Sequence, residues 1–423
     1  MTDMIKSQPK KRIVIGNTDI GKFSIVYQIE ETGHVKEFAE WIGAAIEAAC
    51  GISLPLFSDD APLLVHEILV GNTNRPESQE FFKLYNTDLL HYHFGLHGQK
   101  YTIVGGGMFS LMKAVEHFIE QYLQEDGATT VIQADEVVSN VHENGTVAHA
   151  NGSLIRIMTH NIMAVRHAKH WFHESNPPTA PKRIEIIQAV LRAYTPDVVG
   201  YQEACDGWRQ TLAAELDPSV WGIFDPGRAD GSNGETIFIY NKNRLKLIDA
   251  APVAYPEYAY NSRIVWAHFA CLAHPKKQFL IYNTHWAGHA AKPDTEQGLA
   301  ANMEKDAMAK LIFDMRREHG GIPAFTTGDY NTYYQADRYF SFREISGLTD
   351  SFDLAREAGD GVLQNICGGC SRRGGDRDAT PLSESIDHIF CPHDTKIHRY
   401  ETVTGYRVNE LSDHSPRYVD VSF

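Results

Sequence analysis

Strong polar side chains recur in the second half of the chain, at points where short apolar segments end. These groups are Thr159-His160-Asn161, Gln202-Glu203, Asn283-Thr284-His285, Gly328-Asp329-Tyr330-Asn331, Asp387-His388 and Ser412-Asp413-His414. Strong polar groups at the ends of buried strands are costly to leave without a partner or a function. If the segments are strands of shared sheets, the groups converge in one cleft.

The residue types in these groups indicate metal-assisted phosphate chemistry. The oxygens of Glu203, Asp413 and Asn161 are hard ligands that suit magnesium or manganese better than zinc. Two histidines and a spare carboxylate could move protons and stabilise charge around a phosphorus centre. The sequence carries no activated serine or cysteine motif and no phosphate-binding Gly-Lys loop. Direct attack by water is therefore favoured over a covalent intermediate.

The ordered set of motifs resembles the endonuclease/exonuclease/phosphatase superfamily over residues 154–423. That superfamily includes pancreatic-type deoxyribonucleases, abasic-site endonucleases, bacterial sphingomyelinases and inositol polyphosphate phosphatases. A single tetrapeptide arises easily by chance, but six motifs in order make the resemblance specific. It implies an α/β fold, a four-layer α/β/β/α sandwich, with the active site at one edge of the paired sheets.

The resemblance implies metal ligands and a general base. Glu203 and Asn161 would hold the metal, with Asp413 as the candidate for a second position. His414 would act as the general base, and Asp387 would orient it. Taken alone, each asparagine could cap a turn and each histidine could be a satisfied core residue.

The remaining matched residues are assigned to the substrate side of the reaction. Asp329 would position the attacking water, and Asn331 and His285 would contact phosphoryl oxygens. Two weaker assignments are Glu235 as the group that orients His285 and Arg263 as a phosphate clamp.

Two positions depart from the family pattern. Tyr330 stands where Phe is usual, and His388 stands where Tyr or Arg is common. His388 is therefore expected on the substrate-facing wall, as a substrate-binding residue, without an effect on the mechanism.

Short strands and few helices must position these residues. Strands are expected at 154–158, 198–201, 236–240, 264–272, 279–283, 324–327 and 386–390, and helices at 182–193 and 299–317. Recurrent apolar strands with few long helices favour two mostly β layers flanked by helices.

The first part of the chain predicts a separate, smaller α/β domain. Strands are expected at 12–16, 23–29, 67–70 and 100–104, and amphipathic helices at 35–49 and 109–123. The sequence becomes polar and rich in small residues between 136 and 153. This composition predicts a boundary that separates an N-terminal domain, 1–150, from a catalytic domain, 151–423.

The N-terminal domain offers a clue to the substrate. Segments 67–75 and 100–105 resemble the non-catalytic N-terminal domain of hexosaminidase-like and glucuronidase-like glycoside hydrolases. This resemblance implies a carbohydrate-processing context. The expected substrate is a phosphorylated sugar or glycan, with a phosphodiester as the favoured linkage.

Net charge and sequence features help to rank the alternative functions. The 423-residue chain has a formal net charge of −15, which gives no long-range attraction to a nucleic acid. A nuclease is nevertheless the leading alternative, because the superfamily contains many. A sphingomyelinase-like lipid esterase comes third, since no membrane-docking stretch is evident, and a non-enzymatic carbohydrate-binding protein is the alternative from another class. No membrane partner is expected, and the sequence makes no prediction of oligomeric state.

The N-terminus and the cysteines favour a cytoplasmic protein. Residues 1–12 are polar and basic and lack the apolar core of a secretory signal. The six cysteines are scattered and do not form a small-domain disulfide framework. Secretion is expected only if a leader has been removed.

Three further groups have simpler structural explanations. The histidines at 167, 170 and 173 could coordinate a metal, but without carboxylate partners a substrate-lining or surface role is favoured. The two cysteines of the 367–377 loop lack a second pair, so a Gly-rich loop is favoured over zinc, and its three arginines could contact an anion. The glycines at 105–107 favour a tight turn over an anion site.

Overall fold

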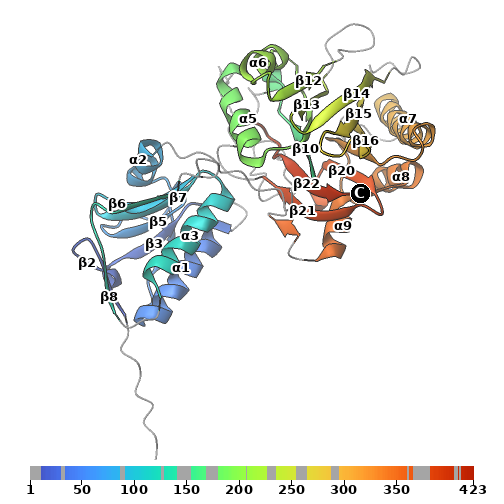
Figure 1. Ribbon diagram of the computed structural model, residues 1–423. Helices are drawn as coiled ribbons and strands as arrows, with labels where there is room; N and C mark the ends of the chain where they lie inside the picture. Colours follow the sequence, from blue (N-terminus) through green and yellow to red (C-terminus); the bar gives the residue numbers. More distant parts are fainter. Residues whose placement is uncertain are drawn as a thin grey trace, which may run out of the picture. The chain divides into compact units, whose positions relative to one another are not determined.

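A computed structural model (Figure 1) describes residues 11–29, 34–85, 91–124, 128–140, 154–167, 180–205, 207–225, 235–253, 264–286, 295–359, 362–364, 382–403, 408 and 411–423. The chain forms two compact units, and the main division lies between residues 146 and 147. The boundary predicted between 150 and 151 falls outside the described residues, so its position stays a prediction.

The N-terminal unit is built on a six-stranded sheet. The strand order is β4 (Leu56–Ser58), β3 (Ser24–Tyr27), β5 (Glu67–Val70), β7 (Lys100–Gly105), β6 (Tyr92–His97) and β9 (Val137–Asn140). A three-stranded sheet contains β2 (Thr18–Asp19), β1 (Arg12–Ile15) and β8 (Thr129–Ile132).

Helices pack on both faces of the six-stranded sheet. Helices α1 (His34–Cys50) and α3 (Met108–Tyr122) share a core with Ile103, whereas α2 (Pro76–Leu84) packs on Val104. Successive strand residues point to opposite faces, so neighbouring residues of β7 serve the two sides. At Gly105, a Cβ atom would lie 2.2 Å from the backbone nitrogen of Leu111. This close approach supports the tight turn predicted before α3.

The C-terminal unit contains two mixed sheets. The seven-stranded sheet has the order β12 (Trp221–Phe224), β13 (Ile237–Asn241), β11 (Val198–Gln202), β10 (Ile155–Asn161), β22 (Arg417–Ser422), β21 (Lys396–Thr402) and β19 (Leu363–Gln364). The six-stranded sheet has the order β14 (Leu245–Pro252), β15 (Ile264–Cys271), β16 (Gln278–His285), β17 (Ala324–Asp329), β20 (Asp387–Pro392) and β18 (Leu348–Asp350).

The sheets pack face to face between two layers of helices. The core between them joins Ile157 and Val198 of the first sheet to Phe269 and Ile281 of the second. Figure 1 shows α5 (Ala180–Tyr194) and α6 (Trp208–Glu215) beside the first sheet, and α7 (Glu296–Glu318) and α8 (Asp337–Ser346) beside the second. A further helix, α9 (Ser351–Ala358), follows β18. The four-layer α/β/β/α prediction is confirmed.

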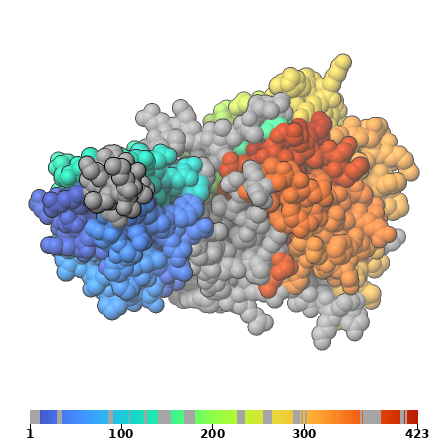
Figure 2. Space-filling model, turned by 90° about the horizontal axis from the view of Figure 1, so that it is seen from below, coloured from blue at the N-terminus to red at the C-terminus, as the bar shows by residue number. Residues whose placement is uncertain are grey.

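The last third of the chain forms much of one face of this unit. In Figure 2 the residues coloured orange to red gather on that face. They include β22, which pairs with β10 in the middle of the seven-stranded sheet. Within the described ranges, no helix combines the length and the apolar character that crossing a membrane requires.

Candidate active site

Strand register explains why residues distant in sequence meet at one edge. Strands β16 and β17 are parallel with His285 opposite Asp329, and antiparallel β20 places Asp387 opposite Asp329. In the other sheet, parallel β10 and β11 end with Asn161 opposite Gln202. The carboxyl ends of four strands and the beginning of β20 therefore share one edge of the paired sheets.

A buried amide network joins the two sheets behind this edge. Gln202 donates to Asn283 Oδ1 at 2.6 Å, and Asn283 donates to the backbone oxygens of Tyr201 and Ile237 at 2.8 and 3.0 Å. A Cβ atom at Gly200 would lie 2.1 Å from Thr327 Oγ1, so glycine is required where the sheets approach. Gln202 and Asn283, two members of the polar motifs, therefore connect the sheets.

Asn161 lies between two carboxylates from opposite sheets. Its Nδ2 donates to Glu203 Oε1 and to Asp329 Oδ2, both at 3.0 Å, and its Oδ1 accepts from the Met163 amide at 2.9 Å. Met163 and Glu203 have φ angles of 53° and 58°, unusual for residues other than glycine. Such backbone strain often accompanies a functional site, and here it aims the Glu203 carboxylate at the shared edge.

Glu203 is held in its ionised form. Burial raises the pKa of its carboxyl group, but the hydrogen bond from His167 and the charge of His285 outweigh burial. The resulting pKa is well below the usual value for glutamate. The same hydrogen bond, 2.8 Å from His167 Nδ1 to Glu203 Oε2, raises the pKa of His167.

His414 and Asp387 form a buried pair. Nδ1 of His414 lies 2.8 Å from Asp387 Oδ2, and its Nε2 lies 3.8 Å from Asp329 Oδ2. Ser412 Oγ accepts from the His414 amide at 3.1 Å and donates to the Asn161 carbonyl at 2.6 Å. A carboxylate at Nδ1 favours the tautomer with the proton on that nitrogen, which leaves Nε2 able to accept a proton.

His285 bridges two carboxylates. Its Nδ1 lies 3.3 Å from Glu235 Oε2, and its Nε2 lies 3.5 Å from Asp329 Oδ2. Asn331, with a φ of 47°, donates from its backbone to Asp329 Oδ1 at 2.9 Å and from Nδ2 to the Trp286 carbonyl at 2.8 Å.

The donor set fits a hard divalent cation. Asp329, Asp387 and His414 are buried, and each offers a ligand atom within 4.8 Å of those of the other two. Asp387 Oδ1 is buried without a hydrogen-bond partner among the described residues. With the carboxylates of Glu203 and Asp329 on either side of Asn161, the edge concentrates oxygen ligands of the kind that magnesium and manganese prefer.

Two predicted residues have different outcomes. Asp413 is half-buried, and its charge helps to raise the pKa of His167. Asp413 therefore lies near the pair formed by His167 and Glu203. His388 is 2% exposed, and its nitrogens lie 2.9 Å from Asp350 Oδ2 and 3.1 Å from the Thr332 carbonyl. These contacts indicate a structural role for His388. They do not support the predicted contact with the substrate, which stays a prediction.

Other assignments fall on residues that the structure does not describe. Arg263, the histidines at 170 and 173, and the loop 367–377 lie outside the described residues. Their predicted roles stay predictions.

Sequence reasoning missed Arg183 as a support of the site. Its guanidinium donates to the carbonyls of Leu411 at 2.5 Å, Ile162 at 3.2 Å and Met163 at 3.1 Å, and it stacks on Trp208. Burial lowers the pKa of Arg183 to about 10. It thereby ties the segment after Asn161 to the one before Ser412. An arginine in the apolar stripe of the predicted helix 182–193 was the available signal.

Arg166 was also missed. Its Nη2 donates to Glu235 Oε1 at 2.8 Å. It lies in a polar stretch that carries no motif, so sequence offered no signal for it.

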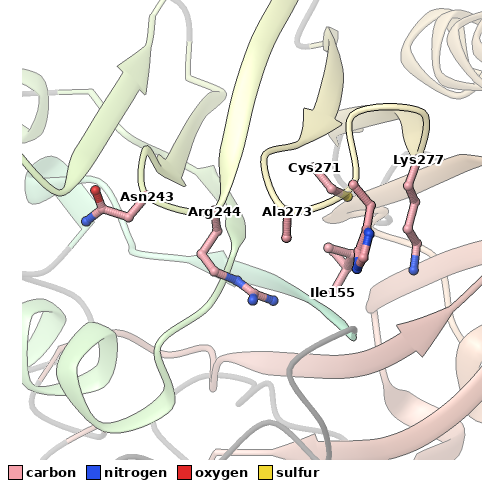
Figure 3. Close-up of a pocket in the computed structure, with 7 residues that line it drawn as sticks. Ile155, Asn243, Arg244, Cys271, Ala273 and Lys277 are labelled. Atoms are coloured by element: carbon pink, nitrogen blue, oxygen red, sulfur yellow. The ribbon is translucent and has the colours of Figure 1, made fainter.

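A small cavity lies at the opposite end of the sheets. It encloses about 80 Å³ and is lined by residues that include Ile155, Arg244 and Lys277 (Figure 3). Ile155 begins β10, whereas Asn161 ends it. This cavity is therefore separate from the candidate active site.

Comparison with known proteins identifies the family. The protein-family model described as "Endonuclease/Exonuclease/phosphatase family" matches residues 158–414 of this sequence. No curated protein matches the sequence.

Solved structures show similar folds at low sequence identity. An endonuclease/exonuclease/phosphatase from Bacteroides vulgatus is 22% identical, with a TM-score of 0.50, and the match covers 64% of this chain and 99% of that one. A mannosyl-6-phosphatase from Bacteroides thetaiotaomicron VPI-5482 is 18% identical, with a TM-score of 0.48 and coverage of 64% and 100%. The human nocturnin catalytic domain with bound sulfate is 19% identical, with a TM-score of 0.47 and coverage of 64% and 95%.

Proposed function

The chain belongs to the endonuclease/exonuclease/phosphatase family and is a metal-dependent phosphoric ester hydrolase, and we propose that it hydrolyses a phosphodiester of a phosphorylated sugar or glycan. The metal is magnesium or manganese, and water attacks the phosphorus directly. A cytoplasmic location belongs to the same proposal.

One atom carries the argument for the reaction. Oδ2 of Asp329 accepts from Asn161 at 3.0 Å and lies 3.5 Å from His285 Nε2 and 3.8 Å from His414 Nε2. A carboxylate oxygen, an amide and two imidazoles from both sheets thus meet at one point. Ligand, base and charge-stabilising groups within reach of one another are what hydrolysis at phosphorus requires.

The proposed roles follow from these contacts. A metal held by Glu203 and Asn161 would stabilise negative charge on the phosphoryl oxygens. His414 takes a proton from the attacking water at Nε2, because Asp387 holds Nδ1. Asp329 positions that water.

His285 and Asn331 complete the proposed reaction. His285, which lies between the carboxylates of Glu235 and Asp329, donates to a phosphoryl oxygen as charge develops. The side-chain amide of Asn331 is proposed to contact a phosphoryl oxygen as well.

The carbohydrate part of the proposal rests on the N-terminal unit. Segments 67–75 and 100–105 carry the resemblance to glycoside-hydrolase-associated domains, and both lie in the six-stranded sheet unit or its loops. The unit supplies none of the residues assigned to phosphoryl chemistry. Its proposed role is contact with the glycan away from the scissile bond.

A panel of substrates tests the proposal. The full-length protein would be assayed with magnesium on bis-p-nitrophenyl phosphate, p-nitrophenyl phosphate, plasmid DNA and a glycan phosphodiester. We expect the diesters to be cleaved, with the glycan fastest. Faster cleavage of DNA than of any sugar phosphate would establish the nuclease alternative, and no cleavage of any ester would reject the proposal.

A further inference from the structure

Arg166 combines an oriented head group with an accessible side chain. Its Nη1 donates to Cys205 Sγ at 2.9 Å, and its Nη2 donates to Glu235 Oε1 at 2.8 Å. The Glu235 side chain is 7% exposed, whereas that of Arg166 is 46% exposed. A buried carboxylate therefore orients the guanidinium group of a side chain that remains accessible to solvent.

Glu235 connects this guanidinium group to the active site. One carboxylate oxygen contacts Arg166, and the other lies 3.3 Å from Nδ1 of His285. The residue after Arg166 is His167, whose ring contacts Glu203 at 2.8 Å. Only the Glu235 side chain therefore separates Arg166 from His285, the proposed charge-stabilising residue. Arg166 also precedes His167, which contacts the proposed metal ligand Glu203.

The buried carboxylates of the site would repel a phosphate ester, so a protein cation in addition to the metal would favour its binding. Glu203, Asp329 and Asp387 are buried carboxylates, and like charges disfavour an anionic substrate. Arg183 cannot contact a substrate, because it is 1% exposed and donates to three backbone carbonyls. Arg166, by contrast, is accessible at this edge.

We propose that Arg166 is a substrate-binding residue that contacts an oxyanion of the phosphate ester. This inference rests on the proposed function and deepens it by naming a residue that binds the substrate. The planar guanidinium group matches two phosphate oxygens, whereas a lysine would supply only a point charge.

Binding of inorganic phosphate tests this role without turnover. Titration calorimetry would compare the full-length wild type with Arg166→Gln and Arg166→Lys in the presence of magnesium. Loss of a hydrogen bond to a charged group predicts roughly ten- to a hundredfold weaker binding in Arg166→Gln. Arg166→Lys should lie between that variant and the wild type. Equal phosphate affinity in all three folded proteins would overturn the inference.

Lys277→Gln is the matched control. Lys277 lines the cavity at the opposite end of the sheets (Figure 3), and its Nζ lies 4.4 Å from the centre of the Phe423 ring. The substitution removes the same formal charge from the same unit. Phosphate affinity should stay unchanged, and an equal loss would reject the inference in favour of a general charge effect.

Steady-state kinetics separate substrate binding from positioning of His285. With bis-p-nitrophenyl phosphate, Arg166→Gln should raise KM about tenfold or more, with a smaller change in kcat, and Arg166→Lys should recover part of the KM. A lower kcat with an unchanged KM in both variants would show that Arg166 acts only through Glu235. Wild-type protein without metal-dependent hydrolysis would instead refute the proposed function itself.

Discussion

The two ends of the paired sheets both bury charged residues, but they arrange them differently. Where β10 begins, Arg156 contacts Asp420 through Nε and Nη2, both at 2.7 Å, and Arg244 contacts Asp197 at 2.7 Å. Both of these buried carboxylates are paired with an arginine. Where β10 ends, buried carboxylates meet histidines and an amide.

This difference separates charges that stabilise the fold from charges available for chemistry. A carboxylate paired with an arginine through two hydrogen bonds has little capacity left for a ligand. At the catalytic edge, Asp329 Oδ2 and Glu203 Oε1 share one amide group. These oxygens can exchange that contact for a metal ion.

The largest effect should come from removing a proposed metal ligand. Glu203→Ala should lower the rate of phosphodiester hydrolysis about a thousandfold or more, because metal coordination supplies several kcal/mol of charge stabilisation. Its binding of Mn²⁺, measured by titration calorimetry, should weaken in parallel. A folded Glu203→Ala protein with unchanged Mn²⁺ affinity would place the metal elsewhere.

Removing the proposed general base should have the next largest effect. His414→Ala should reduce kcat about 10²- to 10⁴-fold, the usual contribution of a positioned base. Since the base must be neutral, the wild-type rate should fall as the pH is lowered, and the variant should lose this dependence. A near-native rate and pH profile in His414→Ala would contradict the assignment.

At the opposite end, substitution should affect stability and leave the chemistry intact. Asp420→Asn leaves the buried Arg156 without its charged partner, which should cost about 3–5 kcal/mol in the free energy of unfolding. Denaturant titration would measure this loss. The kcat on a small diester, measured well below the unfolding temperature, should stay close to the wild-type value, and a large loss of kcat would show that the two ends are not independent.

The smallest effect on small substrates should come from removing the N-terminal unit. A protein that begins near residue 151 should keep activity on bis-p-nitrophenyl phosphate if it remains soluble. Its activity on a phosphorylated glycan should fall much further, because remote contacts aid catalysis only when the substrate carries the remote part. Equal losses on both substrates, with folding intact by circular dichroism, would limit this unit to a packing role.

Much of the fold could be predicted because its signals are local. The apolar runs at 198–201 and 324–327 became β11 and β17, and the predicted helix 299–317 lies within α7. The short helices α6, α8 and α9 and the partly exposed strand β14 were not predicted, because segments of eight to ten residues give little signal.

The site was less predictable, because its contacts join distant segments. The motifs named residues at strand ends, but not that Asn283 would connect the sheets and His388 would bond to Asp350. Nor did they indicate the contact between Arg166 and Glu235, which lie 69 positions apart. Such pairings depend on sheet packing and loop geometry, which local patterns do not specify.

The most direct test is the hydrolysis of bis-p-nitrophenyl phosphate by the wild-type protein before chelation, after exhaustive chelation, and after metal is restored. Because the edge around Asp329 assembles hard oxygen ligands, activity should disappear with the chelator and return with magnesium or manganese. Full activity after complete removal of divalent metal would contradict the central claim that this edge is a metal-dependent phosphoesterase site.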